Sequence, residues 1–591
     1  MPTARPARWR RRWRARSHAR PCIRSPSNAC TSGTTGCCWR WCAPWRKPRG
    51  PSQPDGAPPR RSRRRPRRLL PSPGHERARD DSGEAAVSRA ARETGQESET
   101  TDRPATVIGR GFSFRLGAQA LSALVNVAGM VLLGGYLAAS GYGQYAFYYA
   151  LVPLVAALSD LGVGAIVTRE VARDQALGAR TLGDAILVKG VVSAALLLIV
   201  TVSAPRLLDR QPALLMILVT AAGLIDISQD IGVWFFRAHD RQDLEGLTLL
   251  AGQGLWLAGI GLCAGLRLPV AFAIGVSTLA FALRALLAAV ILSRGLYLPV
   301  FAPEARRLKS LVAEGLPFGL AMFTVVLYGR VGVLLLKWLA NDSAVAYFNV
   351  GYMLSQPLGF ISSALSISAF PSIARRAQNG SRGMGDVLRK TIKYQLVMAV
   401  PIAVGLSLLA ERVIPFLFRH GDFHAAGGAL RILSLGLPLI FLNLTSRYVL
   451  TAMNAQRSYL VAIVIGLAVN LALSAALARP LGAVGACVGL LGGELAVFLA
   501  CQRILGRFVG ITTIVAEMAK PALAGVVMGL AVIALRPANL LLVPFVGALA
   551  YVGMLFALRV FGRDELRVLR GVYVSFRLPG SALLMRARNH S

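Results

Sequence analysis

The chain has 591 residues, of which 54% are hydrophobic and 16% are charged, and its mean hydropathy is +0.51. Soluble domains carry about a quarter charged residues. The composition therefore excludes an ordinary soluble enzyme or binding domain and indicates a chain surrounded by lipid. A formal net charge of +37 also suits a nucleic-acid-binding protein, so the distribution of that charge matters.

The positive charge is spread along the whole chain. Residues 1–110 contain 26 Lys+Arg and 9 Asp+Glu, which leaves 40 basic and 20 acidic residues for the remainder. In the remainder the basic residues lie between apolar stretches, which is typical of the cytoplasmic loops of a membrane protein. We therefore predict no nucleic-acid partner.

Residues 1–110 are rich in Arg, Pro, Ser and Gly and show no apolar periodicity. Such a segment cannot bury enough surface to offset its chain entropy, so we predict a disordered basic tail. Its cysteines lack the paired spacing of a metal site. No methionine occurs between Met1 and Met130, and a second hypothesis is that part of this tail is not translated.

Apolar stretches follow one another from residue 112 to residue 561, and each transmembrane helix needs roughly 20 such residues. The sequence therefore predicts an all-α integral membrane protein of about 14 transmembrane helices. The predicted spans are 114–138, 144–166, 185–204, 211–234, 246–266, 269–292, 314–337, 343–370, 391–411, 426–450, 457–478, 482–503, 519–536 and 540–561.

The loops between these spans carry unequal positive charge. One alternating set contains 18 Lys and Arg residues and the other contains 8. The richer set is predicted to be cytoplasmic, and an even number of spans then places both termini there. The external loops are short, and the longest, around His420, Asp422 and His424, is predicted to be solvated. We predict no catalytic residue, metal or cofactor.

An internal repeat relates the two halves of the apolar region. Leu137-Ala138 with Tyr145 recurs as Leu339-Ala340 with Tyr347, an offset of 202 residues. The same offset relates residues 171–173 to 373–375, and residues 238–242 are echoed at 452–456. Spans 1–6 and 7–12 are therefore predicted to form two parallel lobes, with spans 13 and 14 added.

The residues of this repeat carry a family resemblance over about residues 110–510. Leu-Ala-Ala-Ser-Gly-Tyr-Gly-Gln-Tyr-Ala-Phe at 137–147 is similar to the opening of polysaccharide-biosynthesis flippases of the Wzx type. Similar segments lie at 159–162, 168–170, 319–375, 454–456, 470–471 and 482–486. The resemblance implies the MATE-like fold of the multidrug/oligosaccharidyl-lipid/polysaccharide exporter superfamily, in which two six-helix lobes enclose a cavity that opens alternately to either side.

The predicted organisation has five parts. They are a tail (1–110), an N-terminal lobe (111–292), a C-terminal lobe (293–510), spans 13 and 14 (511–565) and a cytoplasmic C-terminal tail (566–591).

Arginines inside spans are the first candidates for substrate contact, because a charge at mid-bilayer costs about 2.5–3.5 kcal/mol on insertion scales. Arg330 lies well inside the seventh span, and its guanidinium suits a phosphate or diphosphate. The alternative is that it pairs with a carboxylate of a neighbouring helix. Arg284 and Arg447 lie nearer to span ends, and Arg115 lies at the start of the first span.

Acidic and amide side chains are candidates for cation coupling or for a polar cavity wall. Asp226 and Asp230 stand four residues apart and share a helix face, although both also suit the cytoplasmic interface. Asp160 could instead pair with Arg169. The remaining candidates are Glu494 in the twelfth span and Asn470 in the eleventh.

The seventh span departs from the family pattern. Many of the proteins that this chain resembles have an Arg-x-Asp pattern there, whereas this chain has Arg330-Val331-Gly332. The carboxylate that could help to bind a cation is absent, so the resemblance does not support a cation site at that position. No nucleotide-binding signature of the G-x-x-x-x-G-K-[ST] type occurs. Energy would have to come from ion gradients, the membrane potential or consumption of product.

The leading functional hypothesis is a flippase of the bacterial plasma membrane that carries an undecaprenyl-diphosphate-linked oligosaccharide. The alternatives are a lipid II flippase and a cation-coupled multidrug exporter. A membrane-embedded glycosyltransferase is disfavoured by the short external loops. The predicted partners are the lipid-linked glycan, membrane lipids, and a polysaccharide polymerase or glycosyltransferases.

Overall fold

The computed structural model describes residues 82–561 except 208, 209, 240, 296, 379–382, 420, 421, 538 and 541. Within the helices it does not describe the side chains of residues 82–113, 115, 116, 207, 210, 211 and 226–229. The chain divides into two compact units, Met1–Gly83 and Glu84–Ser591. Almost all of the first unit lies outside the described residues, and the fold below is that of the second.

Every regular element in the described part of the chain is a helix. The elements are α1 (Ser82–Asp160), α2 (Val163–Arg173), η2 (Gln175–Leu177), α3 (Gly178–Leu207), α4 (Arg210–Ala238), α5 (Gln242–Gly265), α6 (Val270–Gly295), α7 (Ala305–Leu339), α8 (Asp342–Ser355), η3 (Gln356–Leu358), α9 (Gly359–Gln378), α10 (Met384–Leu417), α11 (Ala426–Leu435), α12 (Leu437–Ala452), α13 (Gln456–Leu481), α14 (Ala483–Leu505), α15 (Ile511–Ala534) and α16 (Leu542–Ala557). The predicted all-α class is confirmed. Helices satisfy their own backbone hydrogen bonds, as hydrocarbon requires.

The described residues contain eleven helices long and apolar enough to span a bilayer, or twelve if α11 and α12, which meet at 49°, form one span. Two features separate this number from the predicted fourteen. The first two predicted spans lie in the single helix α1, and α16 has only 16 residues. The total of fourteen stays a prediction, and so does the cytoplasmic side of the termini, which lie outside the described residues.

Helix α1 contains one interruption, at Ala138, whose dihedral angles are φ 55° and ψ −178°. Ala340, its counterpart at the offset of 202 residues, lies just beyond the last residue of α7. Both copies of the repeat thus break a helix at the same position. The second predicted span also ends earlier than expected, because Leu161 and Gly162 adopt positive φ after α1.

The backbone of residues 82–110 is helical and forms the first part of α1, whereas the sequence predicts a disordered tail there. The segment contains several Ala, Glu and Arg residues, which have high helix propensity, and the absence of apolar periodicity gave no sign of it. Residues 1–81 and 566–591 of the two predicted tails lie outside the described residues.

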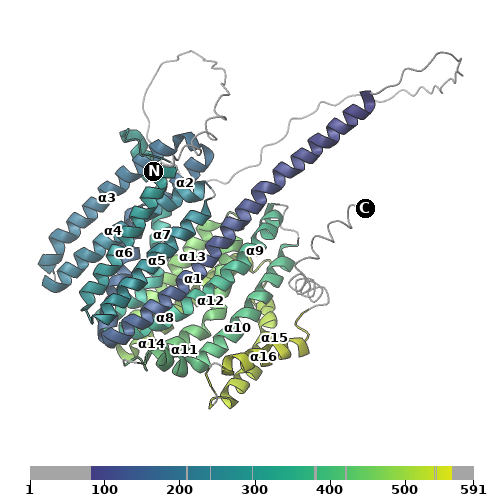
Figure 1. The fold of residues 1–591 in the computed structure, drawn as a ribbon. Helices are drawn as coiled ribbons and strands as arrows, with labels where there is room; N and C mark the ends of the chain where they lie inside the picture. Colours follow the sequence, from purple (N-terminus) through teal and green to yellow (C-terminus); the bar gives the residue numbers. More distant parts are fainter. Residues whose placement is uncertain are drawn as a thin grey trace, which may run out of the picture. The chain divides into compact units, whose positions relative to one another are not determined.

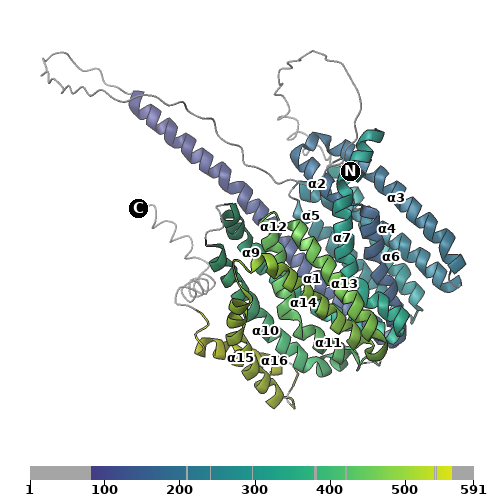
Figure 2. The same cartoon turned by 180° about the vertical axis from the view of Figure 1, so that it is seen from behind.

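Figures 1 and 2 show α3, α4 and α6 together on one side of the helix bundle and α10, α15 and α16 together on the other. Large apolar side chains remain exposed on these outer helices, including Val191 (69%), Leu549 (65%) and Phe545 (71%). An apolar outer surface of this extent is expected where the surrounding solvent is lipid. The chain is a multi-pass membrane protein.

We call the hairpin end that end of the bundle where α1 breaks, α7 passes to α8, and α13 passes to α14. Gly143, just after the break in α1, lies against the backbone of Asp342 at the start of α8, and a Cβ on Gly143 would meet the Asp342 carbonyl oxygen at 1.8 Å. Gly482 in turn lies near Ala344. The opposite end contains the α1–α2 turn, where Gly162 packs against Gly315 and Gly319 of α7.

Candidate functional site

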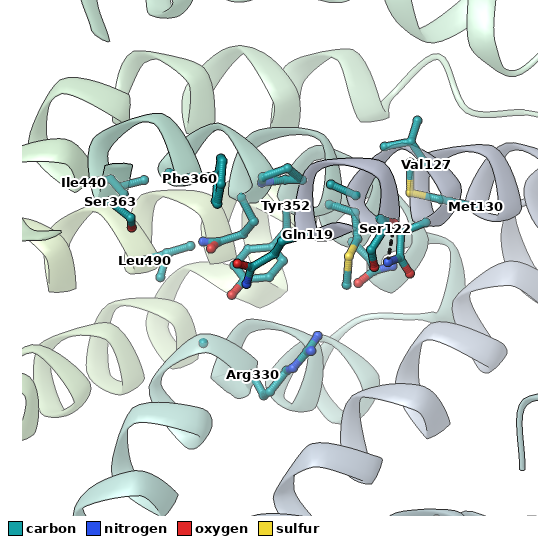
Figure 3. A pocket seen from close by; sticks show the side chains of 18 of the residues that line it. Gln119, Ser122, Val127, Met130, Arg330, Tyr352, Phe360, Ser363, Ile440 and Leu490 are labelled. Carbon is teal, nitrogen blue, oxygen red and sulfur yellow. Dashed lines mark hydrogen bonds between the residues drawn. The ribbon is translucent and has the colours of Figure 1, made fainter. Parts of the chain in front are cut away.

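A cavity of about 930 Å³ lies inside the bundle (Figure 3). One wall comes from α1 and α5 of the predicted N-terminal lobe. The other comes from α7, α8, η3, α9, α12, α13 and α14 of the predicted C-terminal lobe. Its polar and charged lining residues are Gln119, Ser122, Asn126, Gln253, Arg330, Asn349, Gln356, Ser363, Asn443, Arg447 and Glu494. All the charged groups in this set come from the second wall.

Arg330 extends from α7 into the cavity, as Figure 3 shows. The guanidinium is half-buried and interacts electrostatically with the Tyr352 hydroxyl. Gly329 leaves room for that hydroxyl, which a Cβ would approach to 2.9 Å. Among the described residues Arg330 forms no ion pair, so the alternative of a structural Arg–carboxylate pair is not what the structure contains.

Arg447 of α12 provides the second cation of this wall. It is exposed to the cavity, and its guanidinium lies 5.6 Å from the centre of the Tyr448 ring. It also interacts electrostatically with Tyr459 of α13. Arg447, too, has no carboxylate partner within the described part of the chain. The cavity therefore contains two guanidinium groups without a carboxylate partner among the described residues.

Glu494 of α14 is the one described carboxylate in the lining. The amide of Asn443 donates to its Oε2 at 2.6 Å and to its backbone carbonyl at 2.8 Å. The hydroxyl of Tyr328 faces the same carboxylate. Asn443 thus fixes the orientation of Glu494, as expected for a charge held away from bulk water.

The wall formed by α1 and α5 is aromatic and uncharged. Tyr145 and Tyr149 stack with their ring centres 5.5 Å apart. Trp256 of α5 donates from Nε1 to Ser277 Oγ at 3.1 Å, and it also reaches the Tyr145 hydroxyl at 3.3 Å. These bonds fix the rings that face the cavity. Gln253 Oε1, on the same wall, is buried and has no hydrogen-bond partner among the described residues.

The cavity is closed at the hairpin end by contacts between the two walls. The Asn349 amide of α8 donates to the Tyr142 hydroxyl of α1 at 2.8 Å. The Tyr142 ring packs edge-on against Phe423, which stacks on Phe418 at 4.6 Å. A buried hydrogen bond contributes about 0.5–1.5 kcal/mol, so the closure combines a modest polar contact with an aromatic cluster.

At the opposite end, the segment leading into α7 is bound to α2 and α3. Arg307 Nε lies 2.8 Å from Oδ2 of Asp184, whose side chain is fully buried. Arg180 pairs with Glu304 at 2.7 Å and Arg169 with Glu314 at 2.9 Å; both pairs are partly exposed. The start of α7 is therefore held by the predicted N-terminal lobe, while its later turns pack against α13.

Several predicted candidates lie away from the cavity. Asp160 pairs with Lys189 at 3.0 Å and not with Arg169, which is bound to Glu314. The Lys189 ammonium, 4% exposed, also lies 3.7 Å from the centre of the Trp234 ring. Sequence reasoning missed Lys189, although a lysine inside a predicted span was visible as a charge that needs a partner.

Asp230 and Arg284 belong to the same polar cluster within the predicted N-terminal lobe. Both interact electrostatically with each other, and Asp230 also interacts with Lys189. The Arg284 side chain packs on α5, where a Cβ on Gly252 would meet its Cδ at 2.6 Å. Neither residue contributes to the cavity lining. The backbones of Arg115 and Asp226 are helical, but their side chains lie outside the described residues.

Asn470 is a packing residue. It is 1% exposed, donates to the Tyr328 carbonyl at 3.2 Å and accepts from Ser474 at 3.0 Å. At Gly332, a Cβ would lie 2.6 Å from the Phe348 ring. The Asp of the Arg-x-Asp pattern would therefore not fit at position 332 without movement of that ring.

Comparison with known proteins agrees with this architecture. The family model described as "Lipid II flippase MurJ" matches residues 250–557, which is more than half of the chain. The chain belongs to the MurJ family. A second model, "Polysaccharide biosynthesis protein", matches residues 108–376. The resemblance to the MATE-like flippase superfamily, which the sequence indicates, is therefore confirmed.

Individual relatives are distant. The "Probable lipid II flippase MurJ" of Rhizobium tropici is 28% identical over 159 residues, 26% of this chain and 29% of that protein. The chain thus matches less than a third of this curated relative's length. A solved structure of "Lipid II flippase MurJ, inward closed conformation" has a TM-score of 0.64 at 14% identity and covers 76% of this chain and 98% of that one.

A second solved structure, an inward-facing "multidrug resistance MATE family transporter of the MOP superfamily", has a TM-score of 0.54 at 17% identity. It covers 68% of this chain and 98% of its own. At these identities the two structures establish the fold alone. The predicted MATE-like fold is confirmed, and the substrate is left to the chemistry of the cavity.

The closure at the hairpin end yields a prediction. Asn349→Ala removes the hydrogen bond to Tyr142, worth about 1 kcal/mol, and should raise the open population at that end by roughly fivefold. The measurement is the labelling rate of a cysteine introduced at Met353, which lines the cavity, by a membrane-impermeant maleimide applied from each side of the membrane in a background without the native cysteines.

The matched control is Asn126→Ala, because the Asn126 amide also lies in the cavity but donates only within α1, to the Ser122 carbonyl at 2.9 Å. It should leave the labelling rate from the hairpin side unchanged. Equal rates for the two variants would show that the contact between Asn349 and Tyr142 does not hold this end closed.

Proposed function

We propose that the protein is a flippase that moves an undecaprenyl-diphosphate-linked glycan across the bacterial plasma membrane by alternating access. The observation that carries this proposal is the pair of guanidinium groups, Arg330 and Arg447, on one wall of the cavity without a carboxylate partner in the described part of the chain. An unpaired charge in a membrane bundle is costly and marks a substrate path.

The two walls suit the two parts of such a substrate. Guanidinium groups bind phosphate oxygens with paired, planar donors, so the diphosphate belongs on the wall of Arg330 and Arg447. The glycan then faces α1 and α5, where Gln253 Oε1 can accept from a sugar hydroxyl and the fixed rings of Tyr145 and Trp256 offer apolar faces with polar edges.

Lipid II is the first candidate for the glycan, because the family model named for its flippase matches residues 250–557. An undecaprenyl-diphosphate oligosaccharide of another surface polysaccharide is the second, supported by the polysaccharide-biosynthesis model over residues 108–376. Both share the diphosphate, and binding of each purified lipid to the protein distinguishes them.

A multidrug exporter of organic cations is the competing transport function. Its substrates would require an excess of negative charge, whereas the described lining holds two arginines against Glu494. The excess positive charge of this wall favours the anionic lipid. From the distribution of basic residues we expect the hairpin end to face outward, and closure at that end then corresponds to a state that is closed to the outside.

Arg330→Ala should leave the protein folded and inserted but slow its transport by about 10- to 150-fold, because the lost guanidinium contact to a phosphate is worth about 1.5–3 kcal/mol. Arg330→Lys should recover only part, since Lys provides a point charge without the paired donors. The measurement is flipping of fluorescent lipid II and of a fluorescent undecaprenyl-diphosphate oligosaccharide in proteoliposomes.

The control for this experiment is Arg294→Ala, which removes an exposed arginine at the end of α6 that has no ion pair among the described residues. It should flip substrate at the wild-type rate. Wild-type flipping by Arg330→Ala with both lipids would refute the assignment of the diphosphate to this wall.

Glu494→Gln tests the sign of the cavity charge. The neutral side chain keeps an oxygen for the Asn443 amide, so the local structure should persist. Removing the negative charge should tighten diphosphate binding by a few-fold, because it removes about 1 kcal/mol of electrostatic repulsion between the Glu494 carboxylate and the substrate phosphates. The measurement is the dissociation constant of an undecaprenyl-diphosphate sugar and, in parallel, of a cationic dye. A gain for the lipid supports the flippase, and a loss confined to the dye supports the drug exporter.

A further inference from the structure

A second cavity, of about 610 Å³, lies apart from the first, where the beginning of α10 meets α15. It shares no lining residue with the central cavity. Its lining residues are Asp386, Arg389, Lys390, Lys393, Ala516, Glu517, Lys520, Pro521 and Val560. Neither the proposed transport path nor the family comparisons assign a role to it.

The charges of this pocket leave an excess of positive charge, with four basic side chains against two acidic ones. One pair is internal, because Arg389 Nε lies 2.5 Å from Glu517 Oε1 and joins α10 to α15. Lys390 and Lys520 are exposed and form no ion pair within the described part of the chain. Lys393 is half-buried, with Tyr394 and Phe561 rings within 6 Å of its ammonium group.

Helix α15 also carries an exposed apolar strip on the turns that follow Lys520. The strip follows Lys520 towards the C-terminal end of α15 at helical spacing and consists of Leu523 (48% exposed), Val526 (58%) and Leu530 (63%). Helices α15 and α16 lie at one edge of the bundle, beside α10 (Figures 1 and 2). A ligand that occupies the pocket and this strip together must have an anionic head and apolar chains.

The expected position of the pocket in the membrane agrees with such a ligand. Lys390 lies in the first two turns of α10, before the apolar part of that helix, and by the positive-inside rule this end is cytoplasmic. Basic pockets between transmembrane helices on the cytoplasmic side bind anionic lipid head groups. The Lys side chains can extend along apolar surface to reach a phosphate at the interface.

We propose that this pocket binds the phosphate of an anionic glycerophospholipid, with Lys390 and Lys520 as the phosphate ligands and the acyl chains along Leu523, Val526 and Leu530. Arg389 and Glu517 maintain the spacing of α10 and α15 around the head group. The bound lipid would link the last two helices to the predicted C-terminal lobe through a site that is separate from the cargo cavity.

The test is native mass spectrometry of the purified full-length protein titrated with phosphatidylglycerol, with phosphatidylcholine as the zwitterionic probe. The wild type should retain phosphatidylglycerol in preference to phosphatidylcholine. The double variant Lys390→Gln with Lys520→Gln should weaken phosphatidylglycerol binding on the order of tenfold. Each Lys near a lipid phosphate contributes an electrostatic attraction that raises the affinity by a few-fold, and the variant removes two of them. Flipping of the fluorescent glycan lipid, measured separately, reports on the other cavity.

The matched control is Arg306→Gln with Lys309→Gln, which removes the same charge from exposed positions at the start of α7 that have no ion pair among the described residues. It should bind phosphatidylglycerol within twofold of the wild type. If the double Lys variant aggregates, Lys390→Gln and Lys520→Gln singly should each show a smaller loss. Unchanged binding in the Lys variants, no preference of the wild type over phosphatidylcholine, or displacement of phosphatidylglycerol by undecaprenyl phosphate at this site would each overturn the proposal.

Discussion

The cost of placing a charged side chain in hydrocarbon organises this structure. An uncompensated charge at the centre of a bilayer costs several kcal/mol, so each ionic group within the bundle needs a carboxylate, an aromatic ring, an amide or a polar cavity. Asp160 and Lys189 satisfy each other. Arg330 and Arg447 have aromatic neighbours but no carboxylate partner among the described residues, and the central cavity is the polar space in which they lie. The cargo proposed for the cavity supplies the missing charge.

Two sets of contacts join the predicted lobes, one at each end of the bundle. At the hairpin end, Tyr142 and Asn349 join the walls with one hydrogen bond and an aromatic cluster. At the opposite end, Arg307 is held by two carboxylates, the buried Asp184 at 2.8 Å and Glu170 at 3.5 Å. The hairpin contact is therefore the weaker of the two. A cavity that opens by separating its walls would separate them first at the hairpin end.

The sequence predicted the features that depend on composition and periodicity. Apolar stretches located the helices, the repeat matched Ala138 with Ala340, at each of which the structure breaks a helix, and a lone arginine in an apolar span identified Arg330. It could not distinguish Arg447 from Arg284, because both lie near span ends. The difference is the packing partner: Gly252 of α5 receives the Arg284 side chain, whereas Arg447 meets open space. Which face of a helix meets a cavity depends on tertiary packing, which the sequence alone does not give. For the same reason the sequence could not show that Asn470 is a packing residue and not part of the cavity wall.

The central claim is that Arg330 and Arg447 bind the diphosphate of a lipid-linked glycan between the two walls. The most direct measurement is a cryo-electron microscopy structure of the full-length protein in lipid nanodiscs with a saturating undecaprenyl-diphosphate glycan. The account predicts phosphate density within hydrogen-bonding distance of both guanidinium groups, with sugar density towards Gln253 and Trp256. Phosphate density outside the cavity, or an empty cavity at saturating ligand, would contradict it.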